Sequence, residues 1–220
     1  MTRWWGFGVF VVVASVHLVV LFVHADALAF PTKAMLMPAL LLAFVVALPS
    51  RRSEITLWGS LALLLAWAGD VVLGNPGGVG FIMGLASFLL AHVAYLVLYL
   101  RPLRTRRIPG YALVFAIWWV ALVVLLLPYV GDLAIPVAIY GLVLCSAAAV
   151  AMGTTPVVAL GAITFLVSDT LLAFRMFHPS FVLWQADFVI MFFYLGGQAL
   201  IILGAVRFAL SRVVMASETA

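Results

Sequence analysis

Long apolar segments follow one another along the whole chain, each separated from the next by a short polar stretch. Each segment approaches the ~20 residues that a helix needs to cross ~30 Å of hydrocarbon. The breaks carry turn chemistry, such as Asn75-Pro76-Gly77-Gly78, which ends one helix and allows the next to begin. The pattern predicts eight transmembrane helices, at residues 4–24, 32–49, 55–73, 78–100, 110–128, 133–152, 156–177 and 181–210.

The composition agrees with this pattern. Hydrophobic residues make up 68% of the 220 residues and charged residues only 8%, so the chain cannot cover a soluble globule with polar surface. We therefore expect an all-α polytopic membrane protein in which residues 1–220 form a single transmembrane domain. Eight crossings would place both termini on the same side of the membrane.

The basic residues indicate which side that is. Nine of the eleven lysines and arginines fall at one predicted face: Arg3, Arg51, Arg52, Arg101, Arg104, Arg106, Arg107, Arg207 and Arg212. The positive-inside rule makes this face cytoplasmic, which predicts cytoplasmic termini in a bacterial inner or plasma membrane. The net charge of +4 then reflects topology and contact with anionic membrane lipids, and no nucleic-acid surface is expected.

The first segment shares features with a signal peptide. Arg3 precedes its apolar run, and Ala27-Leu28-Ala29 follows as a stretch of mainly small residues. Removing the segment would leave seven spans and separate the termini. We expect it to remain as the first helix.

Two aspartates interrupt otherwise apolar segments. Asp70 and Asp169 lie 99 residues apart in similar surroundings, and each is followed 25 positions later by a tyrosine, Tyr95 and Tyr194. An ionisable residue inside a membrane span is costly and usually marks function. The matched spacing suggests a four-plus-four internal repeat and one site built from two halves.

Depth in the membrane indicates that these groups meet. At 1.5 Å per residue, Asp70 lies roughly 22 Å and Asp169 roughly 20 Å from the cytoplasmic face. Polar residues spaced three or four apart project from single faces of the returning helices: His92 with Tyr95, and Tyr194 with Gln198. We predict one polar pocket that opens towards the outer face.

The ordered motifs also carry a family resemblance. They are Thr32-Lys33, Met35-Leu36-Met37-Pro38, Ala66-Trp67-Ala68-Gly69-Asp70, the run from Gly84 to Tyr95, Gly161-Ala162, Ser168-Asp169, and Tyr194 with Gln198. Together, over about residues 32–202, they resemble the YhhN-like lysoplasmalogenase family. The resemblance implies an integral membrane enzyme that hydrolyses the vinyl ether bond of lysoplasmalogen to a fatty aldehyde and a glycerophospho-alcohol. Its partners would be a lysophospholipid, water and the surrounding membrane lipids.

The residues suit this chemistry independently of the resemblance. Vinyl ether hydrolysis begins with proton transfer to the β-carbon and gives an oxocarbenium ion that water captures. It needs one protonated acid and one nearby carboxylate. Two carboxyl groups in a poorly solvated pocket cannot easily both ionise, and glycoside hydrolysis uses paired carboxylates around a similar cation. We hypothesise that Asp70 and Asp169 are the acid and base; the sequence leaves open which is which.

Two cations near the outer face are candidates for substrate binding. Lys33, at the predicted start of the second helix, is placed to meet a phosphate, although an interfacial lysine that snorkels to the headgroups is the alternative. Arg175, near the outer end of the seventh helix, serves either the same phosphate or interfacial anchoring.

The neutral polar residues have similar alternatives. Tyr95, Tyr194 and Gln198 orient the carboxylates and the water, or else form hydrogen bonds between helices. His92 holds a proton relay, or else packs as a satisfied buried histidine. His17, His24 and His178 lack the spacing of a metal cluster and are interpreted as structural, so neither a metal nor another cofactor is expected.

A transporter or channel is the main alternative function. Polar groups near mid-membrane and a possible repeat are typical of transporters, and an aspartate pair can carry protons. The absence of Gly-broken spans around the carboxylates favours an enzyme. A membrane scaffold without chemistry would leave the paired acids unexplained.

Overall fold

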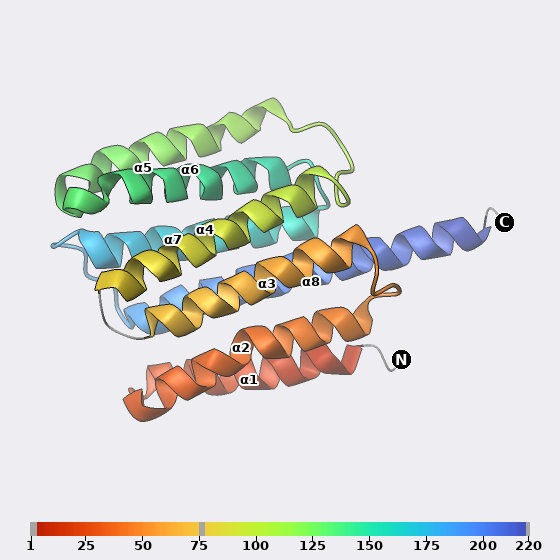
Figure 1. The fold of residues 1–220 in the computed structure, drawn as a ribbon, viewed down its shortest axis with the longest axis horizontal. Coiled ribbons are helices and arrows are strands. Elements are labelled where there is room, and N and C mark those ends of the chain that lie inside the picture. The colour runs from red at the N-terminus through yellow and green to blue at the C-terminus, as the bar shows by residue number, and fades with distance from the viewer. Residues whose placement is uncertain (1–3, 75–77, 219–220) are drawn as a thin grey trace.

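The computed structural model describes residues 4–74 and 78–218, and the regular secondary structure of these residues is helical throughout. They form eight α-helices: α1 (Trp5–Phe22), α2 (Asp26–Ala47), α3 (Glu54–Leu73), α4 (Gly78–Leu100), α5 (Val114–Val130), α6 (Ala134–Ala151), α7 (Pro156–Phe177) and α8 (Ala186–Glu218). Successive helices run up and down the long axis of the molecule (Figure 1). The turn predicted at Asn75-Pro76-Gly77 lies outside the described residues.

The helices have the length and apolarity of membrane spans. Seven helical stretches meet this description among the described residues, and one of them, Gly110–Ala151, contains both α5 and α6. These two helices reverse direction at the short helix η3 (Gly131–Leu133), whose first residue has φ +56°, a left-handed conformation that glycine adopts without strain. The chain is therefore an all-α integral membrane protein, and eight separate crossings remain an expectation.

Both ends of the described chain lie at the same end of the bundle (Figure 1). The loops that hold Arg51, Arg52 and the arginines of residues 101–107 lie at that end too. The opposite end holds the α1–α2, α5–α6 and α7–α8 connections. We refer to these as the basic end and the far end.

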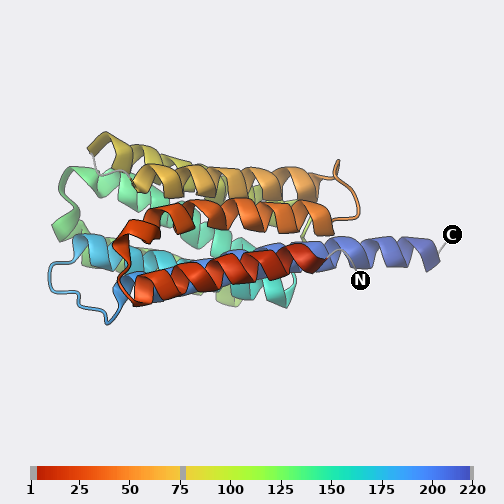
Figure 2. The same cartoon turned by 90° about the horizontal axis from the view of Figure 1, so that it is seen from below.

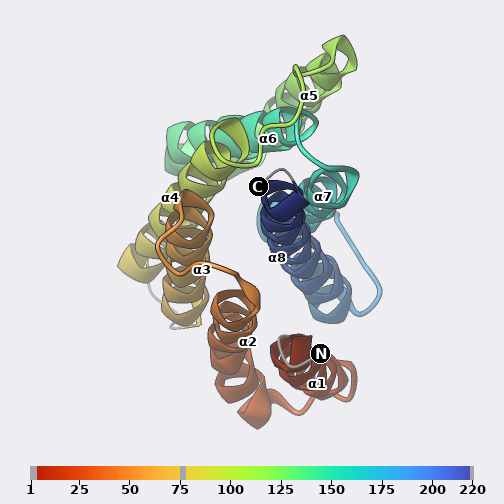
Figure 3. The same ribbon diagram turned by 90° about the vertical axis from the view of Figure 1, so that its right-hand side faces the viewer.

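Seen along its axis, the bundle is an arc of helices around α8 (Figure 3). α8 packs against α7, α1, α2 and α3, while α6 joins α4 to α7 and α5 lies outermost. Glycines allow the closest approach: a Cβ on Gly161 of α7 would lie 2.7 Å from the Ile201 nitrogen, and one on Gly197 of α8 would lie 2.8 Å from the Phe165 nitrogen. The backbones of α7 and α8 are thus in contact, as small residues permit in membrane helices.

Several helix boundaries differ from the sequence prediction; α5, for example, begins at Val114, after a short 3-10 helix at Gly110–Leu113. α2 begins at Asp26, six residues before the predicted start, and continues through Pro31. The Thr32 hydroxyl donates to the Leu28 carbonyl at 2.6 Å in this turn, a side-chain bond to residue i−4 that threonine commonly makes within helices. Lys33 therefore lies inside the helix and not at its first turn.

α8 begins at Ala186, five residues after the predicted start, and ends at Glu218, eight residues after the predicted end. Residues 178–185 form a loop in which the apolar side chains of Val182 and Trp184 are exposed, so their hydrophobicity does not signal a helix. At its other end α8 projects beyond the bundle with residues 211–218 exposed (Figure 2).

Candidate active site

A cavity of about 310 Å³ lies between α1, α2, α3, α7 and α8, in the half of the bundle nearer the far end, and Phe88 of α4 and Tyr140 of α6 complete its lining. Asp70 of α3 and Asp169 of α7 both line it. Each aspartate lies in the later part of a helix that starts at the basic end. The geometry needed for a shared site is therefore present, while the chemical roles of the two residues remain a prediction.

Asp70 is held by a cation and a hydroxyl. Its side chain is 3% exposed, and its Oδ1 lies 3.1 Å from the Nζ of Lys33. The Tyr194 hydroxyl donates to its Oδ2 at 2.8 Å. Both oxygens thus have a donor, and the Lys33 ammonium balances the charge of an ionised Asp70.

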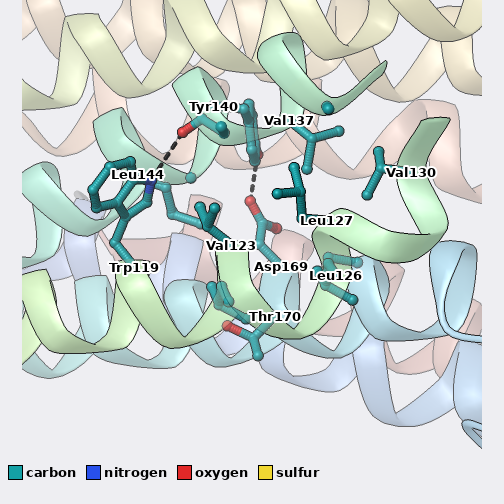
Figure 4. Close-up of a pocket in the computed structure, with 15 residues that line it drawn as sticks. Trp119, Val123, Leu126, Leu127, Val130, Val137, Tyr140, Leu144, Asp169 and Thr170 are labelled. Carbon is teal, nitrogen blue, oxygen red and sulfur yellow. Dashed lines mark hydrogen bonds between the residues drawn. The ribbon is translucent and has the colours of Figure 1, made fainter. Parts of the chain in front are cut away.

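Asp169 has different surroundings. Its Oδ2 accepts a hydrogen bond from the Tyr140 hydroxyl of α6, which Figure 4 shows beside it. The nearest basic group is His92, whose Nε2 lies 4.0 Å from the same oxygen. Among the described residues, no lysine or arginine forms an ion pair with Asp169, so its charge lacks the compensation that Asp70 has.

His92 presents one nitrogen without a partner. Its Nδ1 lies 2.8 Å from the Phe88 carbonyl oxygen, so this nitrogen carries a proton and donates it. Among the described residues, Nε2 is buried with no hydrogen-bond partner and faces Asp169. In the neutral ring Nε2 is an acceptor, placed to receive a proton that Asp169 or a water bound there would donate.

Tyr95 and Gln198 lie deeper in the core. The Tyr95 hydroxyl donates to the Gln198 Oε1, and neither residue lines the cavity. The Phe165 ring packs against Tyr95 and against the site residue Tyr194, with its centroid 6.5 Å from that of Tyr95 and 5.3 Å from that of Tyr194. This position favours support of the site by bonds between helices, the alternative considered for these residues.

The hydrogen bonds do not follow the proposed repeat. Tyr194 bonds to Asp70 across the two halves of the chain, but its counterpart Tyr95 bonds to Gln198. The tyrosine partner of Asp169 is Tyr140, which lies 29 residues before it in the sequence. The four-plus-four repeat therefore remains a hypothesis.

Arg175 lies in a second cavity beside the site. It forms an ion pair with Asp187 at 3.0 Å in this more open cavity of about 360 Å³, together with His24, Trp184 and Gln185. The two cavities share Leu21 and Asp187, so they adjoin near the far end of the bundle. Arg175 does not contact either buried aspartate.

The sequence did not identify two residues of the site. Tyr140 lies in none of the recognised motifs, and nothing local in the apolar sequence of α6 marks it. His17 was interpreted as structural, yet it lines the cavity. The signal that singled out the aspartates, a buried polar group in an apolar span, applied to His17 equally.

Apolar pockets meet the polar cavity at Asp169. One, of about 50 Å³, lies between α5, α6 and α7 and is lined mainly by leucines, valines and alanines (Figure 4). Another, of about 60 Å³, lies between α4, α6 and α7. Tyr140 and Asp169 line both pockets and the main cavity, so the acid stands where polar and aliphatic surroundings join.

Comparison with known proteins identifies a family. Residues 28–205 match the model of the YhhN family, which is most of the chain. No curated protein and no solved structure matches. The matched region includes both aspartates and all of their polar partners described above, and the chain belongs to the YhhN family.

Proposed function

We propose that the protein is a membrane hydrolase that cleaves the vinyl ether bond of a lysoplasmalogen. The observation that carries the proposal is the pair of buried aspartates in one cavity, only one of which has a cationic partner. Family membership supports a lysoplasmalogenase-like reaction. The cavity between lipid-facing helices supports a lipid substrate.

The pockets suggest how this substrate binds. The first carbons of the alkenyl chain occupy the apolar pocket beneath α5, and the glycerol portion occupies the polar cavity. The vinyl ether then lies at Asp169, where the two spaces join. The phosphate headgroup extends towards the second cavity, where Arg175 lies.

The unequal partners suggest an assignment of acid and base. Lys33 stabilises Asp70 as a carboxylate, whereas Asp169 lacks a paired cation and holds a proton more readily in buried surroundings. Tyr140 occupies Oδ2 of Asp169, which leaves Oδ1 to hold the proton that is transferred. In this proposal Asp169 is the general acid and Asp70 the general base.

The first step is protonation of carbon. Asp169 transfers its proton to the β-carbon of the alkene, whose π electrons form the new C–H bond. The adjacent carbon becomes an oxocarbenium ion with the ether oxygen. The two carboxylates then stabilise this cation, as paired carboxylates do in glycoside hydrolysis.

Water completes the reaction. It adds to the cationic carbon as Asp70 takes its proton, which gives a hemiacetal. Asp70 then returns this proton to the ether oxygen as the C–O bond breaks, and the hemiacetal hydroxyl gives its proton to Asp169. The products are a fatty aldehyde and a glycerophospho-alcohol, and both aspartates regain their initial states.

Isotopes test this sequence of steps. Purified protein in nanodiscs would receive an alkenyl lysophospholipid in D₂O, with immediate reduction of the aldehyde to prevent exchange. One deuterium on the carbon next to the former aldehyde carbon is expected, and in H₂¹⁸O the glycerophospho-alcohol should contain no ¹⁸O. Absence of aldehyde, with solute uptake by proteoliposomes instead, would reject the hydrolase in favour of the transporter.

A further inference from the structure

His17 of α1 is a buried polar residue that the proposed reaction does not use. Its side chain is 1% exposed, and it lines the same cavity as Lys33, Asp70 and Asp169. Among the described residues its Nε2 is buried without a hydrogen-bond partner. An unsatisfied buried nitrogen beside a cavity indicates that a ligand or water completes its bonding.

The neighbour of His17 fixes which ring nitrogen holds the proton. Nδ1 lies 2.8 Å from the Thr32 hydroxyl oxygen. That hydroxyl already donates its hydrogen to the Leu28 carbonyl at 2.6 Å, so its oxygen can only accept from His17. Nδ1 therefore carries the proton, and in the neutral ring Nε2 is an acceptor.

An acceptor at this position selects the chemistry of its ligand. The phosphate and ether oxygens of a lysophospholipid are themselves acceptors and cannot satisfy Nε2. The free hydroxyl of the glycerol, on the carbon next to the ether-bearing carbon, is a donor. It is also the group that a second acyl chain would occupy in a diradyl lipid.

We propose that His17 Nε2 accepts a hydrogen bond from the free glycerol hydroxyl of the substrate, and so selects lysophospholipids over their two-chain counterparts. This inference rests on the proposed function for the identity of the substrate. It adds a positioning residue on α1, a helix otherwise at the edge of the site. A site built around a hydroxyl rejects an analogue that lacks it, because the buried acceptor is then left unpaired.

Binding of uncleavable lipids tests the proposal without catalysis. The probes are a 1-O-alkyl lysophosphocholine and its 2-deoxy analogue, which compete with the radiolabelled alkyl lipid for the protein in nanodiscs. The wild-type protein is expected to bind the hydroxyl-bearing lipid about tenfold more tightly, since leaving a buried acceptor unpaired has an effect of this size. In His17→Phe the ratio should fall to about one.

Two further variants separate recognition from packing. His17→Gln retains a neutral acceptor at similar reach and should restore part of the preference. His178→Phe removes a histidine that packs against Tyr129 and Phe174 outside the cavity, and should keep the wild-type ratio.

The outcomes distinguish this proposal from the proposed function. Equal binding of both lipids by the wild-type protein, or a preference that persists in His17→Phe, would overturn the role of His17 even if vinyl ethers are hydrolysed. A preference that depends on His17 without any aldehyde release would keep the binding site and reject the hydrolase. Failure to bind either lipid would overturn both.

Discussion

Lys33 Nζ and Asp70 Oδ1 are 3.1 Å apart in the interior of the bundle, where the lysine side chain is 27% exposed and the aspartate 3%. A lysine expected to meet phosphate at the membrane surface thus contacts the proposed base directly. The pair links α2 to α3, and Tyr194 adds α8 to the same carboxylate. The substrate can still reach Lys33, because this residue lines the cavity.

Removal of this cation should impair the base. In Lys33→Met the Asp70 carboxylate has no balancing charge and will be protonated, so turnover should fall about 100-fold, a typical contribution of general base catalysis. Lys33→Arg keeps the charge and should retain more activity. Measurement of aldehyde release by both variants checks this, with Arg175→Met as the control. An equal loss of kcat in Arg175→Met would contradict a special role for Lys33.

Replacement of the proposed acid should stop protonation of carbon. Asp169→Asn cannot supply the proton, and turnover should decrease by about 10²- to 10⁴-fold. Lipid binding should persist, because the amide fills the same space and can still accept from Tyr140. Single-turnover kinetics with a binding measurement separates the two effects, and full activity of the folded variant would exclude Asp169 as the acid.

Loss of the hydroxyl should affect activity at Tyr140 but stability at Tyr95. Tyr140→Phe removes the hydroxyl that bonds to Asp169, and we expect a loss of activity of about tenfold, comparable with one hydrogen bond to a charged or reacting group. Tyr95→Phe removes a bond to Gln198 away from the cavity. It should lower thermal stability with little change in turnover; the reverse pattern would place Tyr95 at the chemistry.

The apolar pocket should set the preferred chain length. Ala173 lines both apolar pockets one helical turn after Asp169, so Ala173→Phe should fill them and favour short alkenyl chains. Leu160→Phe, on a lipid-exposed position of the same helix, should leave the preference unchanged. Competition between a short-chain and a long-chain substrate measures this preference. An unaltered ratio of their turnover rates in Ala173→Phe would show that the alkenyl chain binds outside these pockets.

Close packing of α7 and α8 should limit substitution at Gly197. A Cβ there would meet the Phe165 nitrogen at 2.8 Å, so Gly197→Ala must separate the helices and lose about 1–3 kcal/mol of stability, a typical effect of overpacking. Gly8→Ala, which meets nothing within 4 Å, is the control. Thermal unfolding in detergent compares them, and equal midpoints would contradict the close approach.

The sequence predicts the helices well but the partners of the aspartates poorly. Apolar runs between turn residues locate every helix, and α3, α4 and α7 agree with the prediction to within one residue. The predicted helix boundaries are wrong where hydrophobic residues lie outside a helix, as in the exposed loop around Trp184. Position along the helices also predicts a similar depth for Asp70 and Asp169, and the two residues line one cavity.

Contacts between helices depend on rotation and packing that no local pattern records. The 25-residue spacing in the sequence associates Tyr95 with Asp70 and Tyr194 with Asp169. In the fold, Tyr194 bonds instead to Asp70, and Tyr140 bonds to Asp169. The early start of α2 likewise moves Lys33 from the predicted headgroup position into the site. These corrections identify which acid is compensated, a distinction that the sequence left open.

The 33-residue α8 has a practical consequence for experiments. At 1.5 Å per residue it is about 50 Å long, well beyond the ~30 Å of the hydrocarbon layer. Because one uninterrupted helix connects Tyr194 to the projecting end, a helical fusion partner joined there in register would share its orientation. Such a rigid fusion would supply the mass and the fiducial shape that electron microscopy of so small a membrane protein requires, without contacting the cavity.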